Sequence, residues 1–384
     1  MTTPSKGTLS GITVLDLSRL LPGPFCSMIL ADHGARVIMI EDRRFEPESG
    51  FPRLTLRNKE HMVLDLKSPE GRSIFMNMVK KADVVLEGFR PGVVQKLDVD
   101  YDRVKTVNPG IIYCSITGYG QTGPLKDRPG HDVNYIAESG LLSLIGDPDR
   151  PPSIPGFQIA DLAGGGMNAV IGILLALHSR NSTEKGQYID ISMTDGSAAL
   201  LTLAADYSQM NGQPMIRSRS ILSHQYAFYN TYETADHRYL SLGCLEPRFW
   251  INLCRCLNRE EWTGLQFDEA RRVELIDALG GIIKEKTLEE WSTVFENQDI
   301  CWAAVNSIDD VFASPLFQER GMVLDSSTSD GKPIRTFGIP VKLSGEPGSL
   351  RTPPTSFGRD TEPILLEFGY SEQDIVSFRE KRII

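Results

Sequence analysis

The chain has 384 residues, 41% of them hydrophobic, and a formal net charge of −10 at pH 7. This length is enough for one large domain or two ordinary domains with real cores, and the acidic balance argues against general nucleic-acid binding. The longest apolar stretch, Val170 to Leu177, falls far short of the ~20 residues that span a bilayer, so we expect a cytoplasmic protein without membrane partners.

Two strand–helix–strand units are predicted at the start of the chain. Ser68 has the residue type of a helix N-cap and Pro69 suits the first helical position, so a helix begins there. Consecutive units of this kind form parallel sheets, which predicts α/β architecture. The predicted elements are strand 12–17, helix 22–32, strand 36–40, strand 61–66, helix 69–81 and strand 83–86.

After a further strand the pattern breaks into a glycine-rich loop, Gly118 to Pro124, of the kind that often holds ligands at the carboxyl end of a strand. The polar stretch 211–224 indicates a crossover into a smaller α+β domain. We therefore divide the chain into 1–215, 225–325 and a segment 330–384 that returns to the first domain. The later elements are strand 111–116, helices 132–145, 161–179 and 195–210, strands 188–192, 226–233 and 239–244, three helices, strand 301–305 and a last helix 371–381.

The six cysteines are scattered, and the close pair Cys254 and Cys256 does not have metal-ligand spacing. We therefore expect buried free thiols and no metal site.

An acidic pair, Glu41 and Asp42, stands where dinucleotide-binding folds place a ribose-binding carboxylate, but the preceding turn lacks G-x-G-x-x-G. A nicotinamide cofactor is therefore a poor interpretation. Basic residues cluster around the two units instead, several at strand ends where a pyrophosphate or 3′-phosphate could dock. For any single one, an ordinary solvated surface is the favoured alternative. They are Arg43, Arg44, Arg57, Lys59, Lys67, Arg72 and Arg90.

Three residues at predicted helix starts are candidates for proton chemistry. His131 follows a glycine, and the positive end of a helix favours a neutral imidazole that can accept a proton. Asp161 leads the glycines 164–166, whose bare backbone would let a substrate come close. Glu246 precedes Pro247. A helix cap is the alternative for all three, and for a lone histidine it is the more common case.

Several short motifs stand in a specific order along the chain: Gly11-Ile-Thr-Val-Leu-Asp-Leu17, Pro22-Gly-Pro24, Arg57-Asn-Lys59, Leu64-Asp-Leu-Lys67, Ala82 to Gly92, Gly118 to Pro124, Gly130-His-Asp-Val-Asn-Tyr135, Ala160-Asp161 and Leu245-Glu-Pro247. In these motifs and their order, the chain resembles the class III CoA-transferase superfamily, and within it the α-methylacyl-CoA racemases. The resemblance implies a Rossmann-like large domain that binds CoA, a smaller α+β domain, and an interlocked homodimer. A heteromer with a related chain stays open.

The resemblance implies two possible uses of Asp161. Transferases use the matching aspartate as a nucleophile that forms an acyl anhydride and then a thioester with CoA. Racemases use it as one of two proton carriers, the other being the histidine matching His131, assisted by the glutamate matching Glu246. His131 stands where many transferases have phenylalanine, and Leu245-Glu-Pro247 is typical of racemases. We therefore favour racemisation of 2-methylacyl-CoA over CoA transfer, with a non-catalytic CoA-binding subunit as a third hypothesis.

Removing a proton next to a thioester generates an enolate, which requires a base, an acid on the other face, and donors around the carbonyl oxygen. The resemblance supplies this set without a cofactor, because CoA is part of the substrate. It implies catalysis by His131, Asp161 and Glu246, with Asp132 as an orienting carboxylate or relay. We assign CoA contacts to Arg43, Arg57, Lys59, Arg90 and Tyr135, and expect the acyl pocket at apolar positions such as Leu141, Leu144, Ile145 and Met193.

Overall fold

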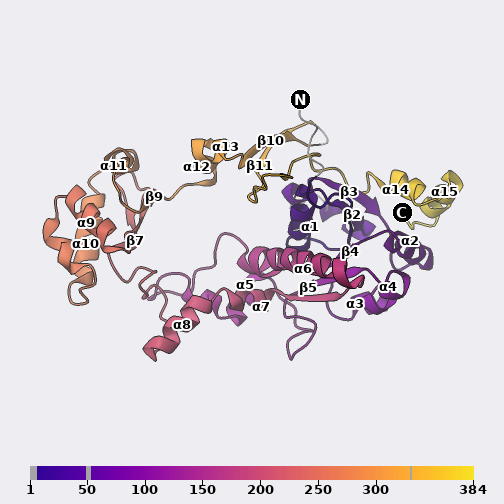
Figure 1. The fold of residues 1–384 in the computed structure, drawn as a ribbon, viewed down its shortest axis with the longest axis horizontal. Coiled ribbons are helices and arrows are strands. Elements are labelled where there is room, and N and C mark those ends of the chain that lie inside the picture. Colours follow the sequence, from indigo (N-terminus) through magenta and orange to yellow (C-terminus); the bar gives the residue numbers. More distant parts are fainter. Residues whose placement is uncertain (1–6, 49–52, 329–330) are drawn as a thin grey trace. The chain divides into compact units, whose positions relative to one another are not determined.

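The computed structural model describes residues 7–48, 53–328 and 331–384 (Figure 1). The chain divides into two compact units, and each is described by itself. The large unit comprises Met1–Leu141, Pro155–Leu201 and Leu316–Ile384, and the small unit comprises Leu142–Ile154 and Thr202–Pro315. The domain limits expected from the sequence stay a prediction.

Six parallel strands form the sheet of the large unit, in the order β3-β2-β1-β4-β5-β6, which confirms the predicted parallel α/β architecture. The order reverses between β1 and β4, and open sheets of this kind bind ligands at the carboxyl ends of the strands near that point. The strands are β1 (Thr13–Asp16), β2 (Arg36–Glu41), β3 (Lys59–Val63), β4 (Val84–Glu87), β5 (Ile112–Thr117) and β6 (Tyr188–Ser192). The strand expected at 61–66 ends at Val63, because the Asp65 N–H bonds to the Ile383 carbonyl in the C-terminal segment instead.

Helices cover the sheet and share its core. The Ser68 hydroxyl accepts a hydrogen bond from the Gly71 N–H, which confirms the predicted N-cap of α2. Buried side chains of α2, α4 and the C-terminal helices pack together with the strands, among them Phe75, Val104 and Leu365. The helices of this unit are α1 (Pro22–Asp32), α2 (Pro69–Val79), α3 (Val93–Lys96), α4 (Tyr101–Val107), α5 (Asp132–Glu138), α6 (Asn168–Thr183), α7 (Met193–Ala199), α14 (Thr361–Glu367) and α15 (Glu372–Glu380). A hairpin of β10 (Val323–Ser327) and β11 (Pro333–Phe337), and helix α13 (Pro315–Glu319), precede α14.

Two predicted helices are shorter than expected. The helix expected at 132–145 ends at Glu138, since Gly140 adopts a left-handed conformation (φ +86°) before the 3₁₀ turn Leu141–Leu144. The helix expected at 195–210 is two helices, α7 and α8 (Thr202–Asn211).

One segment among the described residues, Ala160–Thr183, is long and apolar enough to cross a membrane by length and composition. It exceeds the apolar stretch recognised in the sequence because a π-helical turn, η4 (Ala160–Met167), continues into α6. Half of its most apolar window is buried inside the protein. Core helices of soluble proteins pass the same test, so this is weak support for a membrane span.

The small unit contains an antiparallel sheet in the order β7-β8-β9, with β7 (Tyr229–Glu233), β8 (Tyr239–Gly243) and β9 (Trp302–Ala304). The two paired strands and the third strand expected there are confirmed. A core of aromatic residues that includes Phe228, Trp250 and Trp291 joins the sheet to its helices. The further helices are α9 (Pro247–Cys256), α10 (Arg272–Ile283), α11 (Leu288–Phe295) and α12 (Ile308–Ala313).

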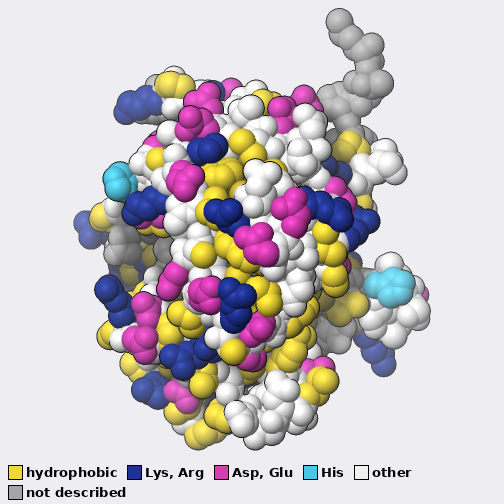
Figure 2. Space-filling model, turned by 90° about the vertical axis from the view of Figure 1, so that its left-hand side faces the viewer, with side chains coloured by type: hydrophobic (Ala, Val, Ile, Leu, Met, Phe, Trp, Pro, Cys, Tyr) yellow, Lys and Arg dark blue, Asp and Glu magenta, His cyan; other side chains and the backbone are white. Residues whose placement is uncertain are grey.

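Figure 2 shows Lys and Arg side chains interspersed with Asp and Glu side chains over the face in view. Charges of both signs, mixed in this way, are typical of a solvated protein surface.

A buried ion pair ties the start of the large unit to its C-terminal part. Arg57 is 4% exposed, and its Nε and Nη2 donate to the Asp32 carboxylate at 3.0 and 2.6 Å. Its Nη1 donates to the Phe337 carbonyl at 2.7 Å. All of these groups lie in segments distant in sequence, so the guanidinium holds β11 against α1.

We therefore expect Arg57→Ala to lower the free energy of unfolding by about 3–5 kcal/mol, because it removes the guanidinium from the buried Asp32 carboxylate and leaves it the Asn58 amide, a neutral donor at 2.8 Å. Chemical denaturation followed by fluorescence measures this. A variant of wild-type stability with weakened CoA binding would contradict the structural role and support the phosphate contact expected from the sequence.

Candidate functional site

A cavity of about 280 Å³ opens at the carboxyl ends of β1, β4 and β5 in the large unit. The segments that follow these strands line it, together with the start of α5 and of η4. We call it the polar cavity. Its basic and titratable residues are Arg19, Arg90, Lys126, Arg128, His131, Tyr135 and Asp161. Basic groups outnumber the one carboxylate, so the cavity suits an anionic ligand.

His131 is the residue before α5 and has extended backbone geometry. Its N–H donates to Asn134 Oδ1 at 3.0 Å, and its carbonyl accepts from the Asn134 N–H at 2.8 Å. The helix start is therefore stabilised by the Asn134 side chain, and the exposed His131 imidazole faces the polar cavity.

Asp161 lies in the π-helical turn η4, a rare geometry that is frequent at functional sites. The glycines that follow it serve packing rather than the substrate approach expected from the sequence. A Cβ at Gly164 would lie 2.6 Å from the Met193 carbonyl, and a Cβ at Gly166 would lie 3.0 Å from the Pro22 carbonyl. Only glycine lets η4 approach α1 and α7 this closely.

Asp132 connects the two candidate proton carriers. Its Oδ1 accepts a hydrogen bond from the Asp161 N–H at 3.0 Å, so the first residue of α5 is joined to η4. Burial raises the pKa of Asp161 to about 6; the negative charge of Asp132 adds to this, and His131 opposes it. A carboxyl group with a pKa near the working pH can both donate and accept a proton.

Tyr135 is a structural wall of the polar cavity. Its hydroxyl donates to the Gly130 carbonyl, and its ring lies edge-on to Tyr119 with centroids 5.2 Å apart. A Cβ at Gly118 would lie 2.3 Å from this ring. Burial raises the pKa of Tyr135 to about 12, so the phenol stays protonated.

A second cavity of about 350 Å³, the apolar groove, continues from the polar cavity. The two share Arg19, Leu20, Gly88 and Phe89. Leu20 has a left-handed backbone (φ +64°) and is 49% exposed, a strained geometry that is often found at ligand sites. The groove is lined mainly by apolar residues, with Arg44 and Lys67 as its further cations.

The predicted CoA contacts divide between these cavities and the core. Arg90 and Tyr135 line the polar cavity. Arg57 and Lys59 are 4% and 3% exposed; the Lys59 ammonium donates to the Pro24 carbonyl at 2.8 Å, and burial lowers its pKa to about 8. Both side chains therefore bind protein groups and are closed to a phosphate. Arg43 lines a separate cavity beside Arg359 and Arg379, and its neighbour Arg44 reaches the groove instead.

Among the apolar positions named from the sequence, Met193 lines the polar cavity. Leu144 and Ile145 belong to the small unit.

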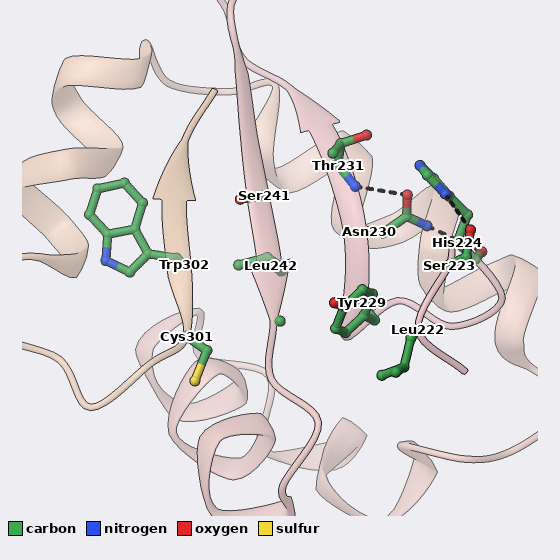
Figure 3. Close-up of a pocket in the computed structure, with 11 residues that line it drawn as sticks. Leu222, Ser223, His224, Tyr229, Asn230, Thr231, Ser241, Leu242, Cys301 and Trp302 are labelled. Carbon is green, nitrogen blue, oxygen red and sulfur yellow. Dashed lines mark hydrogen bonds between the residues drawn. The ribbon is translucent and has the colours of Figure 1, made fainter. Parts of the chain in front are cut away.

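Glu246 lies in the small unit as the residue before α9. It is exposed, and its carboxylate makes no capping hydrogen bond, although its carbonyl accepts from the Phe249 N–H at 3.0 Å. The side chain is thus available for another role. A cavity of about 390 Å³ lies near it on the sheet of this unit, and its wall includes Cys301. Burial raises the pKa of the Cys301 thiol, and the charge of Glu246 adds to this. Figure 3 shows Trp302 and His224 on opposite sides of β8 in this cavity.

All six cysteines are free, four of them buried. Within the described ranges, no group of three or more His, Cys, Asp or Glu side chains is placed to hold a metal ion.

The chain matches CoA-transferase family III over residues 9–361. A human protein named alpha-methylacyl-CoA racemase is 36% identical over 384 residues, which cover 98% of this chain and 97% of the relative. A mouse protein named succinyl-CoA:glutarate CoA-transferase is 32% identical over 382 residues, which cover 94% of this chain and 87% of the relative. The crystal structure of a CaiB/BaiF family protein from Brucella suis is similar with a TM-score of 0.83 and 29% identity, covering 94% of this chain and 99% of that one.

The raised pKa of Asp161 has a measurable effect on stability. Its pKa rises from the ordinary value of 3.8 to about 6 in the protein. The folded state therefore binds the proton more tightly than the unfolded state, and it loses stability as the pH rises between these values. Asp161→Asn removes this loss. Above pH ~7, we expect the free energy of unfolding of the Asp161→Asn variant to be about 1–2 kcal/mol higher than that of the wild type. The difference should vanish toward pH ~4.

Denaturation across this pH range measures the difference, with Asp149→Asn, an exposed carboxylate outside the cavity, as control. An Asp161→Asn variant less stable than the wild type at high pH would mean that favourable contacts hold the carboxylate ionised.

Proposed function

Because the chain belongs to CoA-transferase family III, we propose that it racemises 2-methylacyl-CoA thioesters at the carbon next to the thioester carbonyl. The observation that carries this proposal is the presence of His131 and Asp161 on one cavity, where burial and Asp132 bring the pKa of Asp161 to about 6. The likeness to a racemase across nearly the whole chain supports it.

In this proposal, one carrier removes the α-proton and the electron pair of the C–H bond moves into the thioester to give an enolate. The other carrier then returns a proton to the opposite face of the carbon. His131 accepts a proton as a neutral imidazole, with Glu246 stabilising the imidazolium that forms, and protonated Asp161 donates. In the reverse direction the roles exchange, so that the imidazolium of His131 donates a proton and the Asp161 carboxylate accepts one.

We place the CoA nucleotide in the apolar groove and the thioester in the polar cavity. The groove offers apolar walls for an adenine ring, and Lys67 is its cation for phosphates, since the Arg44 guanidinium is paired with the Asp42 carboxylate (Nε to Oδ2, 2.9 Å). Arg90, Lys126 and Arg128 line the adjoining cavity and can neutralise the remaining charge. The continuity of the two cavities supports a ligand that is nucleotide at one end and acyl thioester at the other.

CoA transfer between carboxylic acids is the second candidate. It is supported by a transferase relative of comparable identity and by the position of Asp161 on the cavity wall. With a pKa of about 6 the carboxylate is largely ionised at neutral pH, as a nucleophile must be. In that mechanism His131 has no proton to carry, and this separates the two candidates.

For the wild type incubated with a 2-methylacyl-CoA in D₂O without any acceptor acid, we expect deuterium to enter the α-position with loss of chirality. His131→Ala and Glu246→Gln should slow this exchange by about 10²–10⁴-fold, the usual contribution of a positioned acid or base. Mass spectrometry follows the label, and chiral chromatography follows inversion.

His237→Ala and Glu260→Gln are matched controls, because both side chains are exposed and lie outside the polar cavity. Absence of exchange in the wild type, with CoA transfer once an acid is added, would overturn the racemase proposal in favour of the transferase.

We also propose that the protein is a homodimer, as the family resemblance implies. Helix α6 and the preceding turn expose a row of large apolar residues, in which Ile171 is 54% and Leu175 is 65% exposed. Such a row is typical of a surface covered by another chain.

We expect Ile171→Asp to prevent the dimer from assembling, because it places an unpaired carboxylate in the interface. Val376→Asp on α15 is the matched control, since Val376 is also 54% exposed. Light scattering after size-exclusion chromatography measures the mass. A monomeric wild type, or equal effects of the two substitutions, would contradict the proposal.

A further inference from the structure

A row of polar side chains crosses three neighbouring strands of the large sheet next to the polar cavity. The strand register sets Glu87 of β4 beside Ser115 of β5, and Ser115 beside Asp190 of β6. Glu87 and Ser115 are 1% and 0% exposed, and neither is among the residues that line the polar cavity or the apolar groove. The proposed reaction therefore gives this buried carboxylate no direct part.

The row is connected by hydrogen bonds to the loops on either side. Glu87 Oε2 accepts from the Phe89 N–H at 2.6 Å, and the Ser115 hydroxyl donates to Glu87 Oε1. Ser115 Oγ in turn accepts from Gln121 Nε2 at 2.7 Å. The Gln121 N–H donates to the Asp190 carboxylate at 3.0 Å.

Both connected loops carry residues of the polar cavity. Phe89 lies in the segment 88–91, which brings Arg90 to the cavity. Gln121 lies in the glycine-rich loop that continues to Lys126 and Arg128, and from there to His131 at the start of α5. Glu87 bonds to the first loop directly and to the second loop through Ser115.

Holding a carboxylate here has a cost. Burial raises the pKa of Glu87 to about 7, which the hydrogen bonds from Ser115 and Phe89 only partly offset and the charge of Asp190 reinforces. Tyr113, Cys114 and Tyr188 are further titratable groups near it. A neutral side chain would avoid this cost, so stability alone does not account for the carboxylate.

We infer that Glu87 is a positioning residue that fixes the loop carrying Arg90 against the loop carrying Lys126 and Arg128, so that the cavity is preorganised for its ligand. The identity of that ligand as a CoA thioester rests on the proposed function; the positioning itself does not. Preorganisation of binding loops acts mainly on affinity, because the ordering is completed before the ligand arrives.

The test compares Glu87→Leu, Glu87→Gln and Ser115→Ala by hydrogen–deuterium exchange of the full-length protein and by calorimetry with free CoA. Asp83→Leu is the matched control: Asp83 directly precedes β4 at the opposite end of the strand, and also accepts from a backbone N–H (Thr13, 2.8 Å) and from a side chain (Arg180, 2.8 Å). It is not part of either cavity wall.

In Glu87→Leu, we expect exchange in residues 88–91 and 118–130 to rise about fivefold or more, and the Kd for CoA to rise about tenfold. In Glu87→Gln, the loop exchange rates and the Kd for CoA should stay within about threefold of the wild-type values, since the amide oxygen can still accept from the Phe89 N–H. Ser115→Ala should loosen 118–130 and leave 88–91 unchanged, which keeps the test decisive if Glu87→Leu does not fold.

Exchange in the two loops that rises no more than in Asp83→Leu would overturn the inference, as would equal effects of Glu87→Gln and Glu87→Leu. A wild type that does not bind CoA would refute the proposed function, while the exchange data would still decide the role of Glu87.

Discussion

The hydrogen bond from the Asp161 N–H to the Asp132 carboxylate, 3.0 Å long, is the contact on which the rest of the site depends. It joins η4 to the start of α5, where His131 is the preceding residue, and so sets one candidate proton carrier against the other. The same carboxylate places a negative charge near Asp161, which adds to the effect of burial on its pKa. One contact therefore both positions the pair and adjusts its acidity.

The packing of the large unit makes this contact possible. The π-helical turn must approach α1 and α7 closely, and glycines at 164 and 166 remove the Cβ atoms that would collide with backbone carbonyls. On the other side, Gly118 and Gly130 leave room for the Tyr135 ring, which closes the wall of the polar cavity. Small residues thus concentrate where helices and loops meet around the site, and they determine how near Asp161 and His131 can come.

Local signals in the sequence predicted much of this arrangement. Apolar strand patterns and the Ser68 cap lead directly to a parallel sheet. At the carboxyl ends of its strands lie Arg90, which follows β4, and the helix-start residues His131 and Asp161. Local sequence patterns could not predict the features that depend on tertiary packing. The 3₁₀ turn Arg43–Glu48 determines that Arg44, and not Arg43, reaches the groove. Lys59 is buried in the core because its ammonium donates to the Pro24 carbonyl of α1. The place of Glu246 relative to His131 depends on how units and chains assemble, which no local pattern encodes.

The central claim is that Asp161 carries a proton and never forms a covalent bond to the acyl group. Turnover of a 2-methylacyl-CoA in the presence of its own free acid, labelled with ¹⁸O in the carboxylate, tests this most directly, because an anhydride mechanism would pass a labelled oxygen to the aspartate. After digestion, mass spectrometry of the peptide that contains Asp161 reads the label. We expect an unlabelled peptide while the substrate racemises. An Asp161 that gains ¹⁸O during turnover would contradict the claim and identify the residue as the nucleophile of a CoA-transferase.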